Sequence, residues 1–160
     1  MLIETVLIDT NLWHYAYVLP KEDNLGSIHR ETREFIINIL SDSSKKVAIS
    51  AYQVAEIIDI LRREKVKVEI IEEILEDFFQ QDKFIIKDIT PSIVRLCAKF
   101  SLFSNIHIYD YLVAIPLKGI VTKIYSADDH FQHKDFKEIA GVMNPISPWI
   151  LREGRKPERR

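Results

Sequence analysis

The stretch Thr5-Val6-Leu7-Ile8-Asp9-Thr10-Asn11 decides the fold that this sequence predicts. Its first four residues form a mostly apolar, β-branched run, which is typical of a strand buried on both faces of a parallel sheet. The run stops at Asp9, and the polar residues that follow mark the end of the strand. Because parallel sheets bind ligands beyond the carboxyl ends of their strands, Asp9 is a candidate site residue.

Outward from this strand, short apolar stretches alternate with helical patterns. Strands are expected at residues 5–8, 47–49, 84–86 and 121–125, and a fifth at 139–143. Helices are expected at residues 28–40, 51–64, 68–80, 91–103 and 105–118, with Ser50 and Thr90 as N-caps of the second and fourth. Pro116 has no backbone N–H, so it should kink or restart the last helix. This alternation predicts the α/β class, with a central parallel sheet of four to five strands and helices on both faces.

The length and composition limit the kind of protein. At 160 residues, 47% of them hydrophobic, the chain is long enough for one domain, expected to span residues 1–150. A single cysteine, Cys97, excludes an intrachain disulfide and a cysteine-based zinc site. No apolar run reaches the roughly 18 residues of a membrane span, and the N-terminus does not resemble a signal peptide. We therefore expect a cytoplasmic protein without a membrane partner.

Basic residues gather at the end of the sequence. Residues 151–160 contain five basic and two acidic side chains, a net charge of +3, whereas the whole chain carries −2. We expect this segment to be a disordered basic tail, with contact to nucleic-acid phosphates as the alternative. The first 150 residues then carry −5, which gives no general support for nucleic-acid binding.

Three more acids, Glu56, Asp110 and Asp128, occupy positions similar to that of Asp9. Each lies shortly after a predicted strand or in the first turns of a helix, so all four can point to one edge of the sheet. A single acid at such a position is usually a helix cap. Four converging carboxylates repel one another, and a hard divalent cation such as Mg²⁺ or Mn²⁺ is the usual remedy. The pattern therefore indicates metal-assisted phosphodiester chemistry.

These segments resemble the PIN-domain ribonucleases, in particular the small toxins of the VapC type. The resemblance covers residues 4–143 and rests on four short motifs. They are Asp9-Thr10-Asn11, Ile49-Ser50-Ala51-Tyr52-Gln53-Val54-Ala55-Glu56-Ile57, Ile108-Tyr109-Asp110-Tyr111-Leu112-Val113-Ala114 and Ile124-Tyr125-Ser126-Ala127-Asp128-Asp129-His130-Phe131. Each motif is weak alone, but four in the right order make a specific signal.

The resemblance implies a three-layer α/β/α PIN-like domain with an acidic catalytic centre. Asp9, Glu56 and Asp110 would be the core ligands of Mg²⁺ or Mn²⁺. Asp128 would be a fourth acid that binds the ion directly or through water. The adjacent Asp129 competes for this fourth position, and the spacing to the following phenylalanine favours Asp128.

The resemblance also implies supporting residues and partners. Thr10, Asn11 and Ser126 would orient the carboxylates or the substrate phosphate. The implied function is a metal-dependent endoribonuclease with RNA as substrate, most simply the toxin of a toxin–antitoxin pair, with a homodimer and a protein antitoxin as partners. Two alternatives stay open: a PIN-domain nuclease that processes RNA within a larger assembly, and a catalytically silent scaffold that binds RNA or protein.

Several conspicuous residues have ordinary structural explanations. Trp13 and its aromatic neighbours could stack on RNA bases, but their spacing favours packing into the core. His107 and His130 flank the third and fourth acids and could approach the substrate, but a histidine near a helix end is usually a cap or a surface residue. The helices between Val54 and Phe79 are more apolar than a small domain easily buries. This surface suggests a homodimer contact or a docking site, with plain core packing as the alternative.

Overall fold

A computed structural model describes residues 2–19, 26–147 and 149–150 of the chain. They contain a five-stranded sheet in the order β3-β2-β1-β4-β5, in which every neighbouring pair is parallel. The strands are β1 (Glu4–Ile8), β2 (Lys45–Ser50), β3 (Phe84–Lys87), β4 (Lys123–Tyr125) and β5 (Gly141–Met143). The predicted parallel sheet is confirmed. Residues 151–160, expected to form a basic tail, lie outside the described residues.

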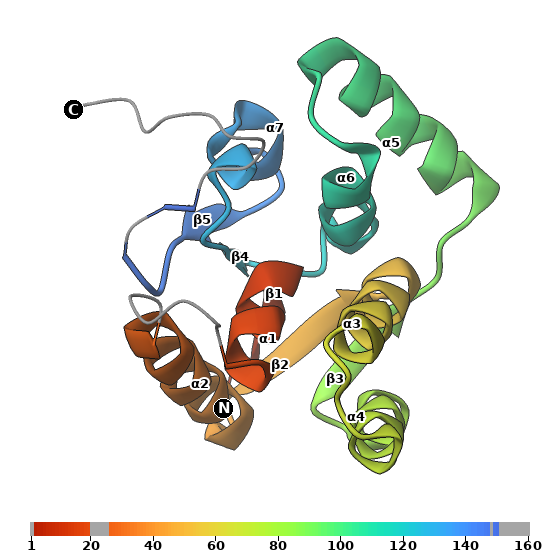
Figure 1. Cartoon of the computed structure of the whole chain (residues 1–160). Coiled ribbons are helices and arrows are strands. Elements are labelled where there is room, and N and C mark those ends of the chain that lie inside the picture. Colours follow the sequence, from red (N-terminus) through yellow and green to blue (C-terminus); the bar gives the residue numbers. More distant parts are fainter. Residues whose placement is uncertain (1, 20–25, 148, 151–160) are drawn as a thin grey trace.

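Helices cover both faces of the sheet (Figure 1). One face carries α1 (Thr10–Tyr17), α2 (Gly26–Ser41), α3 (Ala51–Arg63) and α4 (Val68–Gln80). The other carries α5 (Pro91–Ser104), α6 (Ile108–Ala114), α7 (Lys134–Lys137) and the 3-10 helices η2 (Ile115–Leu117) and η3 (Asp129–Gln132). None of the described helices is long and apolar enough to cross a membrane. The predicted three-layer α/β/α architecture is therefore confirmed.

The central strand β1 is buried because its side chains alternate between two hydrophobic cores. Val6 and Ile8 pack in the core beneath α1 to α4, whereas Leu7 packs in the core beneath α5 and α6. Trp13 joins the first core with 1% of its surface exposed, and its indole N–H donates to the Ile8 carbonyl at 3.1 Å. Its expected place in the core is confirmed. Burial of each large apolar side chain contributes roughly 1.5–3 kcal/mol.

The helix starts follow the predicted caps, but one predicted helix begins later than expected. Ser50 Oγ accepts from the N–H of Gln53 and opens α3, and Thr90 caps α5 in the same way. The helix expected over residues 105–118 begins at Ile108 as α6, and η2 follows it from Ile115. Asn105 has a φ of 60° and ends α5, because asparagine tolerates the left-handed conformation that closes a helix. After α6, Pro116 lies in the separate helix η2, as its missing N–H predicted.

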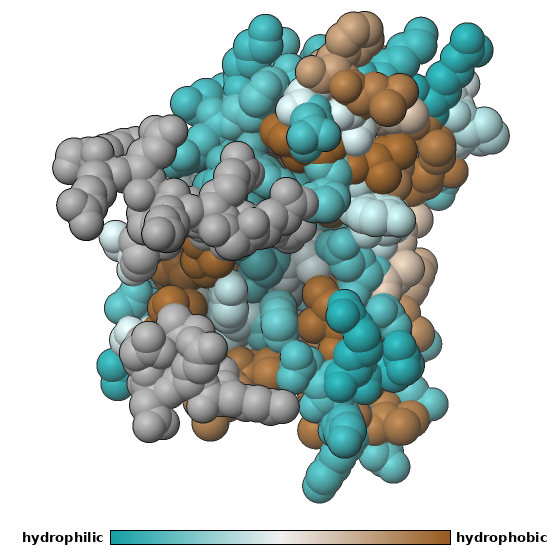
Figure 2. All heavy atoms as spheres, turned by 45° about the horizontal axis from the view of Figure 1, so that its top comes forward, coloured by the Kyte–Doolittle hydropathy of each residue, from teal (hydrophilic) through white to brown (hydrophobic). Residues whose placement is uncertain are grey.

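Apolar side chains remain exposed on α4 and α5. On α4, Val68 and Phe79 are 65% and 63% exposed, whereas Ile74 and Phe78 are buried in the core. The expectation of excess apolar surface between Val54 and Phe79 therefore holds for one side of α4. Figure 2 shows a further apolar area at its upper right, over α5. On this helix, Leu102 and Phe103 are 84% and 93% exposed.

The order of the strands creates a switch point beside β1. From β1 the chain builds outward through β2 and β3, then returns to place β4 on the other side of β1. The N–H of Asp9 donates to the carbonyl of Tyr125 at 2.8 Å, which holds the ends of β1 and β4 together. In sheets of this kind, ligands bind at such a point, outside the carboxyl ends of the strands.

Candidate metal and active site

The four predicted acids come from four elements near the carboxyl edge of the sheet. Asp9 is the N-cap of α1, directly after β1, and Asp128 is the N-cap of η3, shortly after β4. Asp110 lies in the first turn of α6, and Glu56 lies in α3. Asp9, Asp110 and Asp128 are 1%, 3% and 0% exposed, and Glu56 is half-buried. Three of the four acids are thus removed from bulk water.

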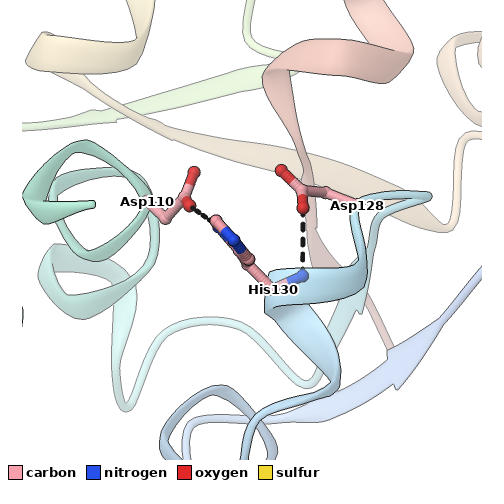
Figure 3. A group of neighbouring side chains, drawn as sticks. All are labelled: Asp110, Asp128 and His130. Carbon is pink, nitrogen blue, oxygen red and sulfur yellow. Dashed lines mark hydrogen bonds and ion pairs between the residues drawn. The ribbon is translucent and has the colours of Figure 1, made fainter. Parts of the chain in front are cut away.

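Asp110 and Asp128 form a compact cluster with His130 (Figure 3). One potential ligand atom of each residue lies within 4.8 Å of the others. Asp110 Oδ2 is hydrogen-bonded to Nδ1 of His130 at 2.9 Å, and Asp128 Oδ1 accepts from the backbone N–H of His130 at 3.0 Å. His130 therefore holds one carboxylate with its ring and the other with its backbone.

The electrostatics of this cluster favour positive charge. The hydrogen bond to Asp110 is the main cause that raises the pKa of His130 above its ordinary value. Burial opposes this shift, and the charge of Asp128 adds to it. Buried carboxylates are costly unless a cation or hydrogen-bond donors compensate them. The field that favours a protonated imidazole would also favour a bound cation.

Asp9 is connected to the cluster through Ser126. The Ser126 hydroxyl donates to Asp9 Oδ2 at 2.8 Å, and its oxygen accepts from the N–H of Asp128 at 3.0 Å. The other oxygen of Asp9 accepts from the N–H of Thr10 at 2.8 Å. One buried hydroxyl therefore fixes the carboxylate of Asp9 relative to the backbone of Asp128.

Glu56 is not part of the three-residue cluster, and its carboxylate accepts a 2.6 Å hydrogen bond from the Tyr52 hydroxyl. Tyr52 also stacks on Tyr109, the neighbour of Asp110, with 5.6 Å between ring centroids. Burial raises the pKa of Tyr52 most, followed by the hydrogen bond to Glu56, and the charge of Asp110 contributes. The Tyr52 hydroxyl therefore lies in the field of both carboxylates.

Asp128 and Asp129 occupy different surroundings. Asp128 belongs to the carboxylate cluster, whereas Asp129 lines an adjacent cavity of about 440 Å³. From the sequence, only the spacing to the following phenylalanine favoured Asp128 over Asp129. In the structure, the two acids also differ in their surroundings. The geometry favours Asp128 over Asp129 as the fourth acid of the candidate site.

The donor atoms present fit a hard divalent cation. Carboxylate oxygens are the preferred ligands of Mg²⁺ and Mn²⁺, and imidazole is accepted by Mn²⁺ more readily than by Mg²⁺. Thr10 Oγ1 and Asn11 Oδ1, next to Asp9 in the sequence, are buried oxygens with no hydrogen-bond partner in the described structure. Such atoms cost about 1–3 kcal/mol each when they stay unsatisfied. A water molecule or another hydrogen-bond donor at these oxygens would remove this cost.

Sequence reasoning missed two residues of this site. His130 was expected to be a cap or a surface residue, and this is wrong, because it is 5% exposed and bonded to Asp110, 20 residues earlier. Gln53 is fully buried, and its side-chain amide donates to the Ile8 carbonyl at 2.6 Å. Gln53 stands three residues after the N-cap Ser50, where a glutamine usually completes a capping box. Here it instead ties α3 to the end of β1.

Comparisons with known proteins bear on the fold. No family model and no curated protein matches the chain. Among solved structures, VapC20 of Mycobacterium tuberculosis, a sarcin–ricin loop cleaving toxin, aligns with a TM-score of 0.61 and 13% identity. The alignment covers 79% of this chain and 92% of VapC20.

Two complexes with DNA are also similar. VapBC2 of Rickettsia felis, bound to a promoter fragment, aligns with a TM-score of 0.54 and 16% identity over 88% of this chain and 98% of that chain. FitAB, bound to a DNA fragment, aligns with a TM-score of 0.52 and 16% identity over 94% and 99%. At these identities the likeness shows the fold. The resemblance to PIN domains of the VapC type is therefore confirmed at the level of the fold.

Proposed function

We propose that this chain is a divalent-metal-dependent endoribonuclease that hydrolyses RNA phosphodiester bonds in the cytoplasm, as the toxin of a toxin–antitoxin pair. The observation that carries the proposal is the buried cluster of Asp110, Asp128 and His130, joined to Asp9 through Ser126 at the switch point of the sheet. The shared fold adds support, since VapC20 is itself a sarcin–ricin loop cleaving toxin.

The four acids would have different roles in binding the ion. Asp110 and Asp128 would bind it directly, with Asp9 and Glu56 completing the acidic set. A bound Mg²⁺ or Mn²⁺ supplies Lewis-acid polarisation of the phosphoryl group and lowers the pKa of water. His130 keeps the carboxylate of Asp110 in one orientation through the 2.9 Å hydrogen bond. Burial of the cluster excludes bulk water, which strengthens its electrostatic interactions.

Neighbouring polar side chains would orient the carboxylates, the water around the ion or the substrate phosphate. Ser126 fixes Asp9, and its hydroxyl lies between the ends of β1 and β4. Thr10 and Asn11 present the buried oxygens that lack a partner in the described structure. We propose that these two residues form hydrogen bonds to the water around the ion or orient the substrate phosphate.

A protein antitoxin and a second copy of the chain are the proposed protein partners. A groove of about 420 Å³ between α3 and α4 is lined by apolar residues such as Val54, Leu75 and the exposed Phe79. An apolar groove between two helices suits the apolar face of a partner helix, so we assign it to the antitoxin. We assign the exposed Leu102 and Phe103 of α5 to the homodimer contact.

Purified protein incubated with mixed RNA tests the proposal. We expect cleavage with Mn²⁺ or Mg²⁺ and none after addition of a chelator. Cleavage that survives the chelator would contradict the metal-dependent mechanism. RNA binding without cleavage in either metal would favour the silent scaffold. Metal-dependent cleavage in a protein that does not arrest growth when expressed would favour a role in RNA processing.

A further inference from the structure

A cavity of about 440 Å³ lies directly beside the carboxylate cluster. One wall comes from the connection between α5 and α6 and includes Asn105 and Ile106. The opposite wall comes from η3 and its end and includes Asp129, Gln132 and His133. His130 is common to both places, since it lines this cavity and belongs to the cluster. A group bound here would therefore lie next to the phosphate on which the cluster acts.

The lining does not suit a phosphate. Among the described residues that form it, none is lysine or arginine, and Asp129 contributes a carboxylate. The ring of His130 is already bonded to the carboxylate of Asp110. Phosphates are bound by cationic side chains and repelled by carboxylates. The cavity volume falls within the range of sites that hold small organic groups. An uncharged ligand is therefore the better match.

The polar side chains of the lining offer both donors and acceptors. Asn105 and Gln132 carry amide groups, each with an N–H₂ donor and a carbonyl acceptor. The ring of His133 adds a third polar group, and its Nδ1 lies 3.2 Å from the backbone nitrogen and 3.3 Å from the carboxylate of Asp135. A mixture of this kind matches the edge of a nucleobase, the uncharged part of an RNA chain.

We propose that this cavity binds the nucleobase adjacent to the scissile phosphate, and that Asp129 selects bases that carry an exocyclic amino group. A carboxylate accepts hydrogen bonds from the amino groups of cytosine, adenine and guanine. Uracil presents carbonyl oxygens in place of an amino group, and these would face the carboxylate unfavourably. The inference rests on the proposed function for its choice of RNA.

Backbone hydrogen bonds to Ile150 hold the segment around Asp129 in place, which suits a carboxylate that selects between bases. The N–H of Asp129 donates to the Ile150 carbonyl at 3.1 Å, and the N–H of Ile150 donates to the Ala127 carbonyl at 2.7 Å. This isolated parallel bridge is centred on Asp128. In this proposal the two neighbouring carboxylates have different roles: Asp128 belongs to the ion-binding cluster, and Asp129 contacts the base in the cavity.

A titration with single nucleosides tests the inference without catalysis. The full ¹⁵N-labelled chain is titrated with adenosine, cytidine, guanosine and uridine, and backbone amides are followed by NMR. We expect shifts at Asn105, Gln132 and His133, with uridine binding about ten-fold more weakly than the others. Asp129→Asn should remove this difference, and the exposed control Asp82→Asn should keep it. Equal binding of uridine, or shifts that map elsewhere, would overturn the inference.

Cleavage-site sequencing on random RNA gives a second readout. Asp129→Asn should erase the base preference at one position beside the cut and leave the affinity for Mn²⁺ within about two-fold of wild type. Asn105→Gly should weaken the same preference, because glycine keeps the positive φ of 60° while it removes the amide. A loss of Mn²⁺ binding in Asp129→Asn would make Asp129 a metal ligand and overturn the inference. If wild type binds nucleosides as expected but cleaves no RNA, the proposed function fails and the base site stands.

Discussion

The hydroxyl of Ser126, at the end of β4, donates a 2.8 Å hydrogen bond to the carboxylate of Asp9, at the end of β1 and 117 residues earlier in the chain. The same oxygen accepts from the N–H of Asp128. The candidate site is therefore a product of the strand order, because the two strands meet only when β4 pairs beside β1.

Ser126→Ala tests this link. Removal of the hydroxyl leaves the Asp9 carboxylate without one donor, so we expect the affinity for Mn²⁺ to fall about 10- to 100-fold. The free energy of unfolding should fall by about 1 kcal/mol. Ser126→Thr keeps the hydroxyl and should retain most of the affinity. Calorimetric titration with Mn²⁺ and urea denaturation measure both quantities, and wild-type affinity in Ser126→Ala would remove Ser126 from the site.

Water is expected to be the nucleophile, because the cluster is built on carboxylates and the ring of His130 is bonded to Asp110. An RNA with a single 2′-deoxy sugar on the 5′ side of the cut should therefore be cleaved within about ten-fold of the normal rate. The alternative is acid–base catalysis by His107 and His130, whose ring centroids lie 5.8 Å apart. That alternative uses the 2′-hydroxyl, so the deoxy substrate would resist cleavage and normal RNA would give 2′,3′-cyclic phosphate ends.

An ion-pair network at the opposite edge of the sheet predicts a pH-dependent stability. The Glu4 carboxylate lies 2.8 Å from Lys45 Nζ and 3.6 Å from Lys123 Nζ. The hydrogen bond from Lys45 is the largest of the causes that lower the pKa of Glu4 below 4.5. Because the folded pKa is the lower one, Glu4 stabilises the fold above about pH 4.5, and this stability is lost as the pH falls through the folded pKa.

Glu4→Gln should therefore lower the free energy of unfolding by roughly 0.5–1 kcal/mol at pH 7, the range of a partly exposed pair. The difference from wild type should shrink steadily below pH 4.5. Urea denaturation at pH 7 and pH 3 measures it, with the exposed Glu138→Gln as control. A difference that stays constant between the two pH values would show that the ion pairs do not stabilise the fold.

The exposed end of α5 predicts the oligomeric state. Leu102 and Phe103 are 84% and 93% exposed, and burial of each against a second copy would contribute roughly 1.5–3 kcal/mol. Replacement of both by aspartate should convert the proposed dimer to a monomer in light scattering coupled to size-exclusion chromatography. Val68→Asp, at an exposed position of α4, should leave the dimer intact. A dimer that survives the α5 change and dissociates with the α4 change would reverse the assignment of the two surfaces.

The local parts of this structure were predictable from the sequence. The apolar run into Asp9 ends a buried strand, and Ser50 and Thr90 cap the helices expected of them, because these effects depend on neighbouring residues. The helix end near Phe103 was expected, but the later start of the next helix, at Ile108 in place of Asn105, was missed. The left-handed conformation of Asn105, which takes this residue out of both helices, is visible only in the backbone.

The pairings between distant residues were not predictable in the same way. The sequence placed His130 near the fourth acid, but its bond to Asp110 depends on how η3 packs against α6. The turn of the Gln53 side chain toward Ile8 likewise depends on the position of α3 beside β1. Such contacts are fixed by tertiary packing, which a short motif does not contain.

Cleavage of RNA by wild type, Asp110→Asn and Asp82→Asn in Mn²⁺ tests the central claim most directly. Asp110 is 3% exposed and lies in the cluster, whereas Asp82 is exposed, so both changes remove one charge but only one alters the site. We predict that Asp110→Asn falls to the level that wild type shows with chelator and that Asp82→Asn cleaves like wild type. Folding of both variants is checked by circular dichroism. Wild-type cleavage by a folded Asp110→Asn would contradict the claim that this cluster is the active site.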